Sequence, residues 1–174
     1  MFPVGGASTD LSNSEAMADC GATTSAGGSE AVTAMIAAIV KDNPDARISF
    51  DENSRPWFRF GNGKWGQALF KVTITFGGSD AFRIMIYVLD SPGVPVLFGM
   101  SALSSWPAII NFENGKAIIK GQLVQLGMTS KKHVIIDCVK DCRNIADMLN
   151  EESKMTNDQV QARRTTFLEI LGRP

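Results

Sequence analysis

The sequence predicts an all-β domain of barrel or sandwich type, with one helical insert and a helical C-terminal extension. The first observation is a series of short segments rich in β-branched and aromatic residues, with a hydrophobic period of about 2. The second is the turn signals that separate them, such as Gly61-Asn62-Gly63 and Glu113-Asn114-Gly115. The third is a helical period on either side of this region. The predicted strand segments are 46–51, 55–60, 67–76, 81–89, 94–98, 108–112 and 117–123.

The composition is that of a folded domain without the excess of basic or acidic residues that would indicate a highly charged partner. Hydrophobic residues make up 44% of the 174 residues and charged residues 20%, which is enough apolar material for a core. The 17 basic and 18 acidic residues nearly cancel, so we expect no direct binding to nucleic acid. No apolar run approaches the ~18 residues that a membrane span needs, and no signal peptide is visible. We therefore expect no membrane association.

The chain divides into three predicted parts. Residues 1–14 are small and polar and are predicted to be a flexible lead. Residues 15–129 hold the predicted strands, and a change of composition near residue 130 begins an extension over 130–174, with one strand at 132–139 and helices at 141–154 and 157–172. Three cysteines form no even disulfide framework, which favours a reducing, intracellular compartment.

A helical insert is predicted early in the chain, before the main run of strands. Val32, Met35, Ile36, Ile39 and Val40 recur at helical spacing, and Ser29 is a candidate N-cap. Asn43-Pro44 should end the helix, because a residue before proline disfavours helical backbone.

The stretch Gly61-Asn62-Gly63-Lys64-Trp65-Gly66 matches the letter pattern of a dinucleotide-binding loop. That function requires a strand before the glycines and a helix after them, whereas both neighbours here are predicted strands. Asn-Gly between two strands instead indicates a hairpin. Trp65 close to the hairpin tip is either an exposed anchor for a ligand or a side chain folded back on the core.

Two further stretches are ambiguous when taken singly. In Asp19-Cys20-Gly21-Ala22-Thr23, the aspartate is either a catalytic carboxylate at a strand end or an ordinary turn residue. In Val96-Leu97-Phe98-Gly99, the glycine either follows a buried strand as a simple turn or allows another backbone to approach closely.

Taken in order, these motifs resemble the retropepsin family of aspartic proteases, and most closely the protease segment of copia-type retrotransposon polyproteins. Residues 19–23 match the Asp-Thr/Ser-Gly-Ala signature, 60–63 resemble the flap, and 96–99 resemble the second signature. Residues 100–103 are similar to the short helix that follows, and 109–112 to the closing strand. The resemblance covers roughly residues 15–120 and implies a closed β-barrel.

The resemblance implies an aspartic endopeptidase that processes a polyprotein within the cytoplasm or a retrotransposon particle. Asp19 would be the catalytic residue, with Cys20, Gly21, Ala22 and Thr23 forming the active-site turn. Phe60, Gly61, Asn62, Gly63 and Trp65 would form the flap over a peptide substrate, and Leu97, Phe98 and Gly99 the second signature. Such a site needs two carboxylates that share one proton. Because the chain has a single Asp-x-Gly, the second carboxylate would come from another copy in a symmetric homodimer.

Two departures from the family pattern leave an alternative open. Cys20 stands where the family has Thr or Ser, and the helical insert is longer than in the compact viral enzymes. A thiol donates and accepts hydrogen bonds weakly, so the bonded lattice across the dimer axis would be weaker. The alternative is a catalytically impaired domain that serves as a dimerisation or peptide-binding module. An unrelated β domain is the remaining interpretation.

His133, Cys138 and Cys142 are the residues that would have to form any metal site. Cys138 and Cys142 lie one helical turn apart, but no fourth ligand is evident, and structural zinc prefers four. We therefore expect these residues to be structural, with neither a metal nor another cofactor bound.

Overall fold

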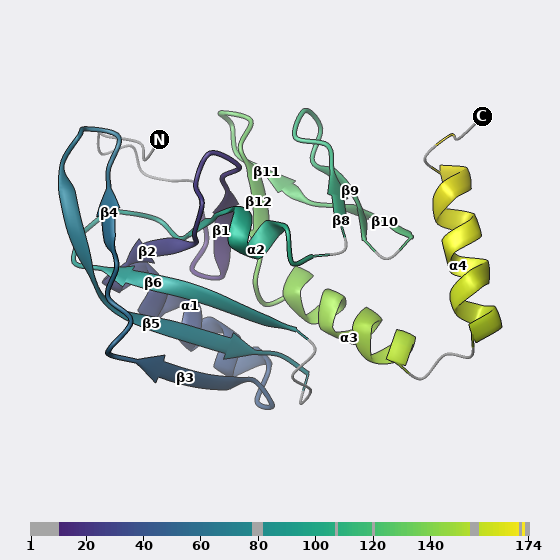
Figure 1. The fold of residues 1–174 in the computed structure, drawn as a ribbon, viewed down its shortest axis with the longest axis horizontal. Helices are drawn as coiled ribbons and strands as arrows, with labels where there is room; N and C mark the ends of the chain where they lie inside the picture. Colours follow the sequence, from purple (N-terminus) through teal and green to yellow (C-terminus); the bar gives the residue numbers. More distant parts are fainter. Residues whose placement is uncertain are drawn as a thin grey trace.

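The computed structural model describes residues 11–77, 82–106, 108–119, 121–153, 157–170 and 172. Within these ranges the chain is mostly β-sheet, with helices α1 to α4 between and after the strands (Figure 1). The predicted flexible lead over 1–14 lies outside the described residues as far as residue 10. The described part of the chain has no helix long and apolar enough to cross a membrane.

The chain enters the fold through two short strands and the predicted helical insert. β1 (Glu15–Ala18) is followed by a loop, and β2 (Ala26–Gly28) runs straight into α1 (Ser29–Asp42). The insert is confirmed as a helix, with Val32, Met35 and Ile39 buried, whereas Ile36 is partly buried and Val40 is exposed. Ser29 as N-cap was wrong, because Gly28 holds that position and no side chain caps the helix. Asn43 is the C-cap, immediately before Pro44, as predicted.

The main sheet is built from long antiparallel strands. β3 (Arg47–Asp51) pairs with β5 (Trp65–Thr75), β5 pairs with β6 (Arg83–Leu89), and β4 (Trp57–Arg59) pairs with the first part of β5. Burial alternates along β6, where Ile84, Ile86 and Val88 are buried. Figure 1 shows α1 behind these strands, and its buried side chains share one core cluster with β5 and β6. The alternation is that of a sheet covered on one face.

The second signature lies between two earlier strands. β7 (Leu97–Phe98) pairs with β1 in parallel and with β2 in the antiparallel sense, and α2 (Met100–Leu103) follows it at once. β2 also pairs in parallel with β6. β7 therefore inserts between the two strands that flank the Asp19 loop, which brings residues about eighty positions apart in sequence side by side.

A separate three-stranded sheet follows α2. It contains β8 (Ala108–Ile110), β9 (Lys116–Ile119) and β10 (Gln122–Gln125). The segment 117–123, predicted as one strand, is divided between β9 and β10, with Gly121 at a φ of +80° between them. A side chain would strain this conformation, so glycine suits the turn.

The expected closed barrel is not present, although the β-rich class is confirmed. The larger sheet has the order β11-β12-β1-β7-β2-β6-β5-β3, where β11 is Gly127–Met128 and β12 is Val134–Asp137. Closure requires the two end strands to hydrogen-bond to each other, and β3 and β11 do not pair. Residues 108–125 form their own sheet and do not extend either end.

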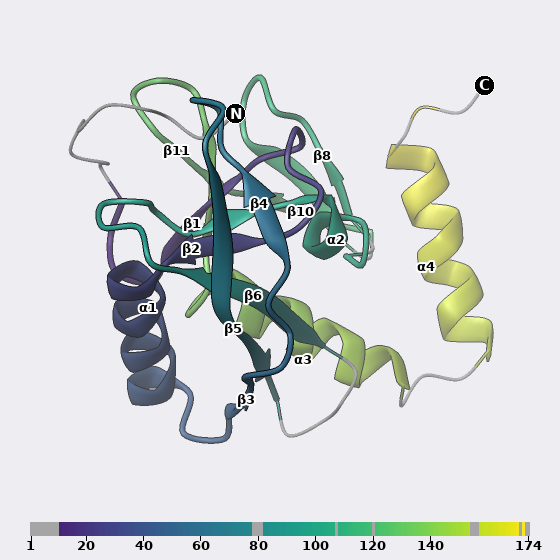
Figure 2. The same cartoon turned by 60° about the vertical axis from the view of Figure 1, so that its left-hand side comes forward.

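The C-terminal part joins the main sheet before its helices begin. β12 pairs with β1, and α3 (Asp141–Ser153) contributes Cys142, Ile145 and Ala146 to the same core as α1. The domain division near residue 130 stays a prediction, and the β1–β12 pairing spans it. α4 (Asn157–Ile170) stands apart from both sheets in Figures 1 and 2.

Candidate active site

Asp19 lies directly after β1, at the start of the loop that leads to β2. Its N–H donates to the Phe98 carbonyl oxygen at 2.9 Å, which ties the loop to β7. The Gly21 N–H donates to Asp19 Oδ1 at 2.9 Å, and the Ala22 N–H donates to the Asp19 carbonyl oxygen at 3.2 Å. The carboxylate is half-buried, and the Gly21 amide lies within hydrogen-bond distance of it. An aspartate that bonds its own downstream amide has a fixed orientation at the strand end.

Gly99 lies where the Asp19 loop passes over the end of β7, and the absence of a side chain lets the two backbones touch. A Cβ at this position would lie 2.6 Å from the Thr24 carbonyl carbon and 2.8 Å from the Ala22 carbonyl oxygen. The Met100 N–H donates to the Ala22 carbonyl oxygen at 2.8 Å, and the Ser101 N–H donates to that of Thr23 at 2.9 Å. Of the two interpretations of this glycine, the close backbone approach is the one observed. The first turn of α2 therefore holds the loop that carries Asp19.

Ser25 completes this crossing and was missed by the sequence analysis. Its side chain is buried, and its Oγ accepts the Gly99 N–H at 3.2 Å. The signal available was a small hydroxyl residue shortly after the Asp-x-Gly motif. That signal is weak, because serine is common in loops and only its partner 74 positions away gives it a role.

The hairpin predicted between strands 55–60 and 67–76 is confirmed, with β4 and β5 on either side of the glycine-rich turn. The Phe60 N–H donates to the Lys64 carbonyl oxygen at 2.8 Å, and the Gly63 N–H donates to that of Phe60 at 2.9 Å. Gly63 adopts a φ of +79°, which favours glycine. Since no helix follows these glycines, the structural context of a dinucleotide-binding loop is absent.

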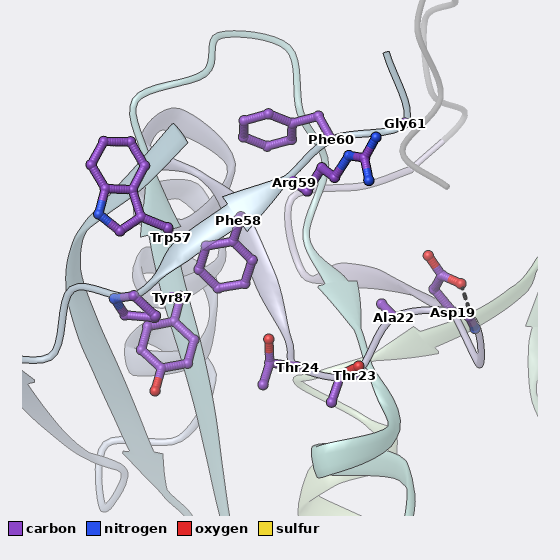
Figure 3. Close-up of a pocket in the computed structure, with 12 residues that line it drawn as sticks. Asp19, Ala22, Thr23, Thr24, Trp57, Phe58, Arg59, Phe60, Gly61 and Tyr87 are labelled. Carbon is purple, nitrogen blue, oxygen red and sulfur yellow. Dashed lines mark hydrogen bonds between the residues drawn. The ribbon is translucent and has the colours of Figure 1, made fainter. Parts of the chain in front are cut away.

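A pocket of about 470 Å³ separates the Asp19 loop from this hairpin (Figure 3). Asp19 and residues 21–24 line one side, and residues 56–61 with Tyr87 line the other. In Figure 3 Asp19 lies toward one end, and the rings of Trp57 and Tyr87 lie toward the opposite end. The Phe58 and Tyr87 ring centroids are 5.5 Å apart, which gives this wall an aromatic surface.

The structure distributes the predicted site residues unevenly around the pocket. Phe60 and Gly61 line it, whereas Asn62, Gly63 and Trp65 lie on the same hairpin without lining it. Trp65 is 62% exposed, so it is not folded back on the core. Leu97 and Phe98 are buried beneath the Asp19 loop, where Phe98 packs edge-on against Trp106 with centroids 5.9 Å apart. Their role in the described structure is to support the backbone crossing.

Thr24, Trp57, Arg59 and Tyr87 are pocket-lining residues that the sequence analysis did not single out. Thr24 belongs to the Asp19 loop, and nothing in the local sequence distinguishes Trp57 and Arg59 of β4 or Tyr87 of β6 from other strand residues. These three residues line the same pocket as Asp19 only because the hairpin and β6 lie across it from the loop.

The three cysteines occupy different environments. Cys20 is exposed on the Asp19 loop, whereas Cys138 and Cys142 are completely buried in the core. Burial raises the pKa of the Cys142 thiol well above its usual value, and a hydrogen bond with Cys138 adds to the effect. A protonated, buried thiol is a poor nucleophile and metal ligand. No cluster of three or more metal-binding side chains occurs among the residues that the structure describes.

No protein-family model matches the chain, and no curated protein matches it.

Proposed function

We propose that this chain is an aspartic endopeptidase of retropepsin type, active as a symmetric homodimer. The main support for the proposal is the close backbone contact at Gly99, where the turn between β7 and α2 hydrogen-bonds to the loop that contains Asp19. The Gly21 amide bonded to the carboxylate and the hairpin across the pocket support it. The resemblance of residues 15–120 to copia-type proteases suggests a polyprotein substrate, met in the cytoplasm or a retrotransposon particle.

The chemistry requires a second copy of the chain. Asp19 is the single carboxylate among the described residues that line the pocket. Two such carboxylates, one from each copy, would share a proton because like charges at close range cannot both ionise. The ionised carboxylate would take a proton from water, and the protonated one would polarise the scissile carbonyl. A symmetric dimer of this kind would have to place the Asp19 loops of the two copies on its two-fold axis.

The second candidate function is a dimerisation or peptide-binding module that no longer cleaves. The observation that favours it is the exposed Cys20, which replaces the hydroxyl expected to bond across the axis. The pocket and hairpin would then hold an extended peptide by strand-like hydrogen bonds without hydrolysis.

The purified chain is expected to cleave a peptide library between pH 4 and 7, with the activity rising toward the acid end. A statine-type transition-state mimic should block the cleavage, because it reproduces the tetrahedral geometry that the dyad stabilises. Sedimentation velocity on the same preparation should show a dimer that the mimic strengthens. Dimerisation with peptide binding but no cleavage favours the module. A monomer at every concentration contradicts both candidates.

Replacing Cys20 with threonine is expected to strengthen the dimer and raise activity. A hydroxyl donates and accepts better than a thiol, and a neutral hydrogen bond contributes about 0.5–1.5 kcal/mol. Two-fold symmetry doubles the gain, so the dimer dissociation constant should fall roughly tenfold or more. Analytical ultracentrifugation under reducing conditions measures the change.

The same experiment without reductant examines oxidation of Cys20. If reductant alone alters the wild-type dimer or its activity, Cys20 is a redox-sensitive position. If Cys20→Thr dimerises no better than wild type under reducing conditions, the hydrogen-bond explanation is wrong.

A further inference from the structure

One cationic side chain lines the pocket beside Asp19. Arg59, the last residue of β4, lines the pocket, and its partner across the hairpin is Trp65 of β5. Figure 3 shows its guanidinium extended from the strand toward the end of the pocket where Asp19 lies. The other charged residue among the described pocket residues is Asp19 itself.

The Arg59 guanidinium is available for a ligand. No hydrogen bond or ion pair joins its side chain to another described residue, and the side chain is exposed. Arg55, four residues earlier on the same segment, differs because its Nε donates to the Ala68 carbonyl oxygen at 3.0 Å. Arg55 therefore supports the hairpin, whereas the five donors of Arg59 lack a protein acceptor within the described structure.

We propose that Arg59 selects a peptide with an aspartate or glutamate side chain near the site of cleavage, at one position on each side of the scissile bond because each copy of the dimer supplies one Arg59. This inference rests on the proposed function and names the class of substrate that the pocket prefers. A guanidinium binds a carboxylate through two parallel hydrogen bonds, which a lysine ammonium does not reproduce. A peptide lying in the pocket would also exclude water around Arg59, which strengthens the attraction between the charges.

The position of the acidic residue is restricted by Asp19. A peptide carboxylate next to Asp19 would be repelled by it. An acidic residue of the peptide therefore forms a favourable ion pair with Arg59 only where it lies beside β4 and away from Asp19. In an extended peptide alternate side chains face the same side, so the preference for each Arg59 should fall on one position and not spread to its neighbours. The rings of Phe58 and Tyr87 would contact an apolar side chain of the same peptide.

Cleavage-site sequencing tests the preference in the wild-type chain. Digestion of a proteome-derived peptide library should show Asp and Glu enriched at two positions placed symmetrically about the scissile bond, one for the Arg59 of each copy. Arg59→Gln should remove the enrichment, and Arg59→Glu should replace it with Lys and Arg. Lys64→Gln is the matched control, because Lys64 is exposed on the same hairpin but does not line the pocket. Cleavage without acidic enrichment, or equal losses in both neutral variants, overturns the inference and leaves the proposed function intact.

Binding to the Asp19→Asn protein tests the same preference without cleavage. The probes are extended aliphatic octapeptides that each contain one glutamate at a different position, and each has a counterpart with glutamine at that position. Tryptophan fluorescence at pH 7 measures their binding. We expect a glutamate at either of the two positions that face an Arg59 to bind roughly 3- to 10-fold more tightly than its glutamine counterpart. Arg59→Gln should abolish that difference, and Lys64→Gln should keep it. If no glutamate position binds more tightly, the inference is wrong. A wild-type chain that cleaves nothing but shows the Arg59-dependent difference contradicts the endopeptidase and supports this inference for the peptide-binding module.

Discussion

Asp19→Asn is expected to lower the cleavage rate by at least about 100-fold, because an amide neither acts as a general base nor shares the proton of the dyad. The fold should survive. Asparagine has nearly the same size, and its side-chain oxygen can still accept the Gly21 N–H that aspartate accepts at 2.9 Å. The measurement is the initial cleavage rate of one library-derived peptide, together with a thermal unfolding curve.

Asp90→Asn is the matched control for this variant. Asp90 is exposed at the end of β6 and does not line the pocket, so its replacement should leave the rate unchanged. Cleavage at the wild-type rate by a contaminant-free Asp19→Asn preparation would remove Asp19 from the mechanism. Equal losses in both variants would show that the effect does not come from the pocket.

Gly99→Ala is expected to destabilise the fold by about 2–4 kcal/mol and to abolish activity with it. The added Cβ would lie 2.6 Å from both the carbonyl carbon and the carbonyl oxygen of Thr24, and these are backbone atoms that no rotamer change can move. Relief of this clash requires the Asp19 loop and the backbone around residue 99 to move apart. The bond from the Met100 N–H to the Ala22 carbonyl oxygen at 2.8 Å would then lengthen or break.

Gly127→Ala separates this contact from the general effect of removing a glycine. The nearest atom to a Cβ at position 127 belongs to the Ile135 side chain at 3.4 Å, an ordinary van der Waals distance. Urea unfolding of both variants should show a near-normal midpoint for Gly127→Ala and a much lower one for Gly99→Ala. Similar midpoints would contradict the close approach at Gly99.

Local patterns in the sequence predicted the individual elements because each signal lies within one segment. The spacing of Val32, Met35 and Ile39 predicted α1, and Asn43-Pro44 predicted its end. The alternating residues of 81–89 predicted β6, and Asn62-Gly63 predicted the hairpin turn. These are consequences of backbone geometry and of burial on one side of a helix or strand.

Long-range pairing produced the elements that the sequence analysis missed. β2 has the sequence Ala-Gly-Gly, which has low β-propensity, and it is a strand because β6 and β7 hydrogen-bond to it from either side. The expected barrel closure failed for a related reason. Closure depends on which strands meet at the ends of the sheet, and no local pattern specifies that for β3 and β11.

The sequence by itself determined the β-rich class, the helical insert and the hairpin. Only the tertiary structure decided that Gly99 lies against the Asp19 loop, that Ser25 holds it there, and that Arg59 and Tyr87 line the same pocket as Asp19. The physical reason is the range of the interactions. Turn and helix signals act over a few residues, whereas these contacts join positions from 40 to 80 residues apart, so they exist only once β7 has inserted between β1 and β2 and the hairpin lies against the loop.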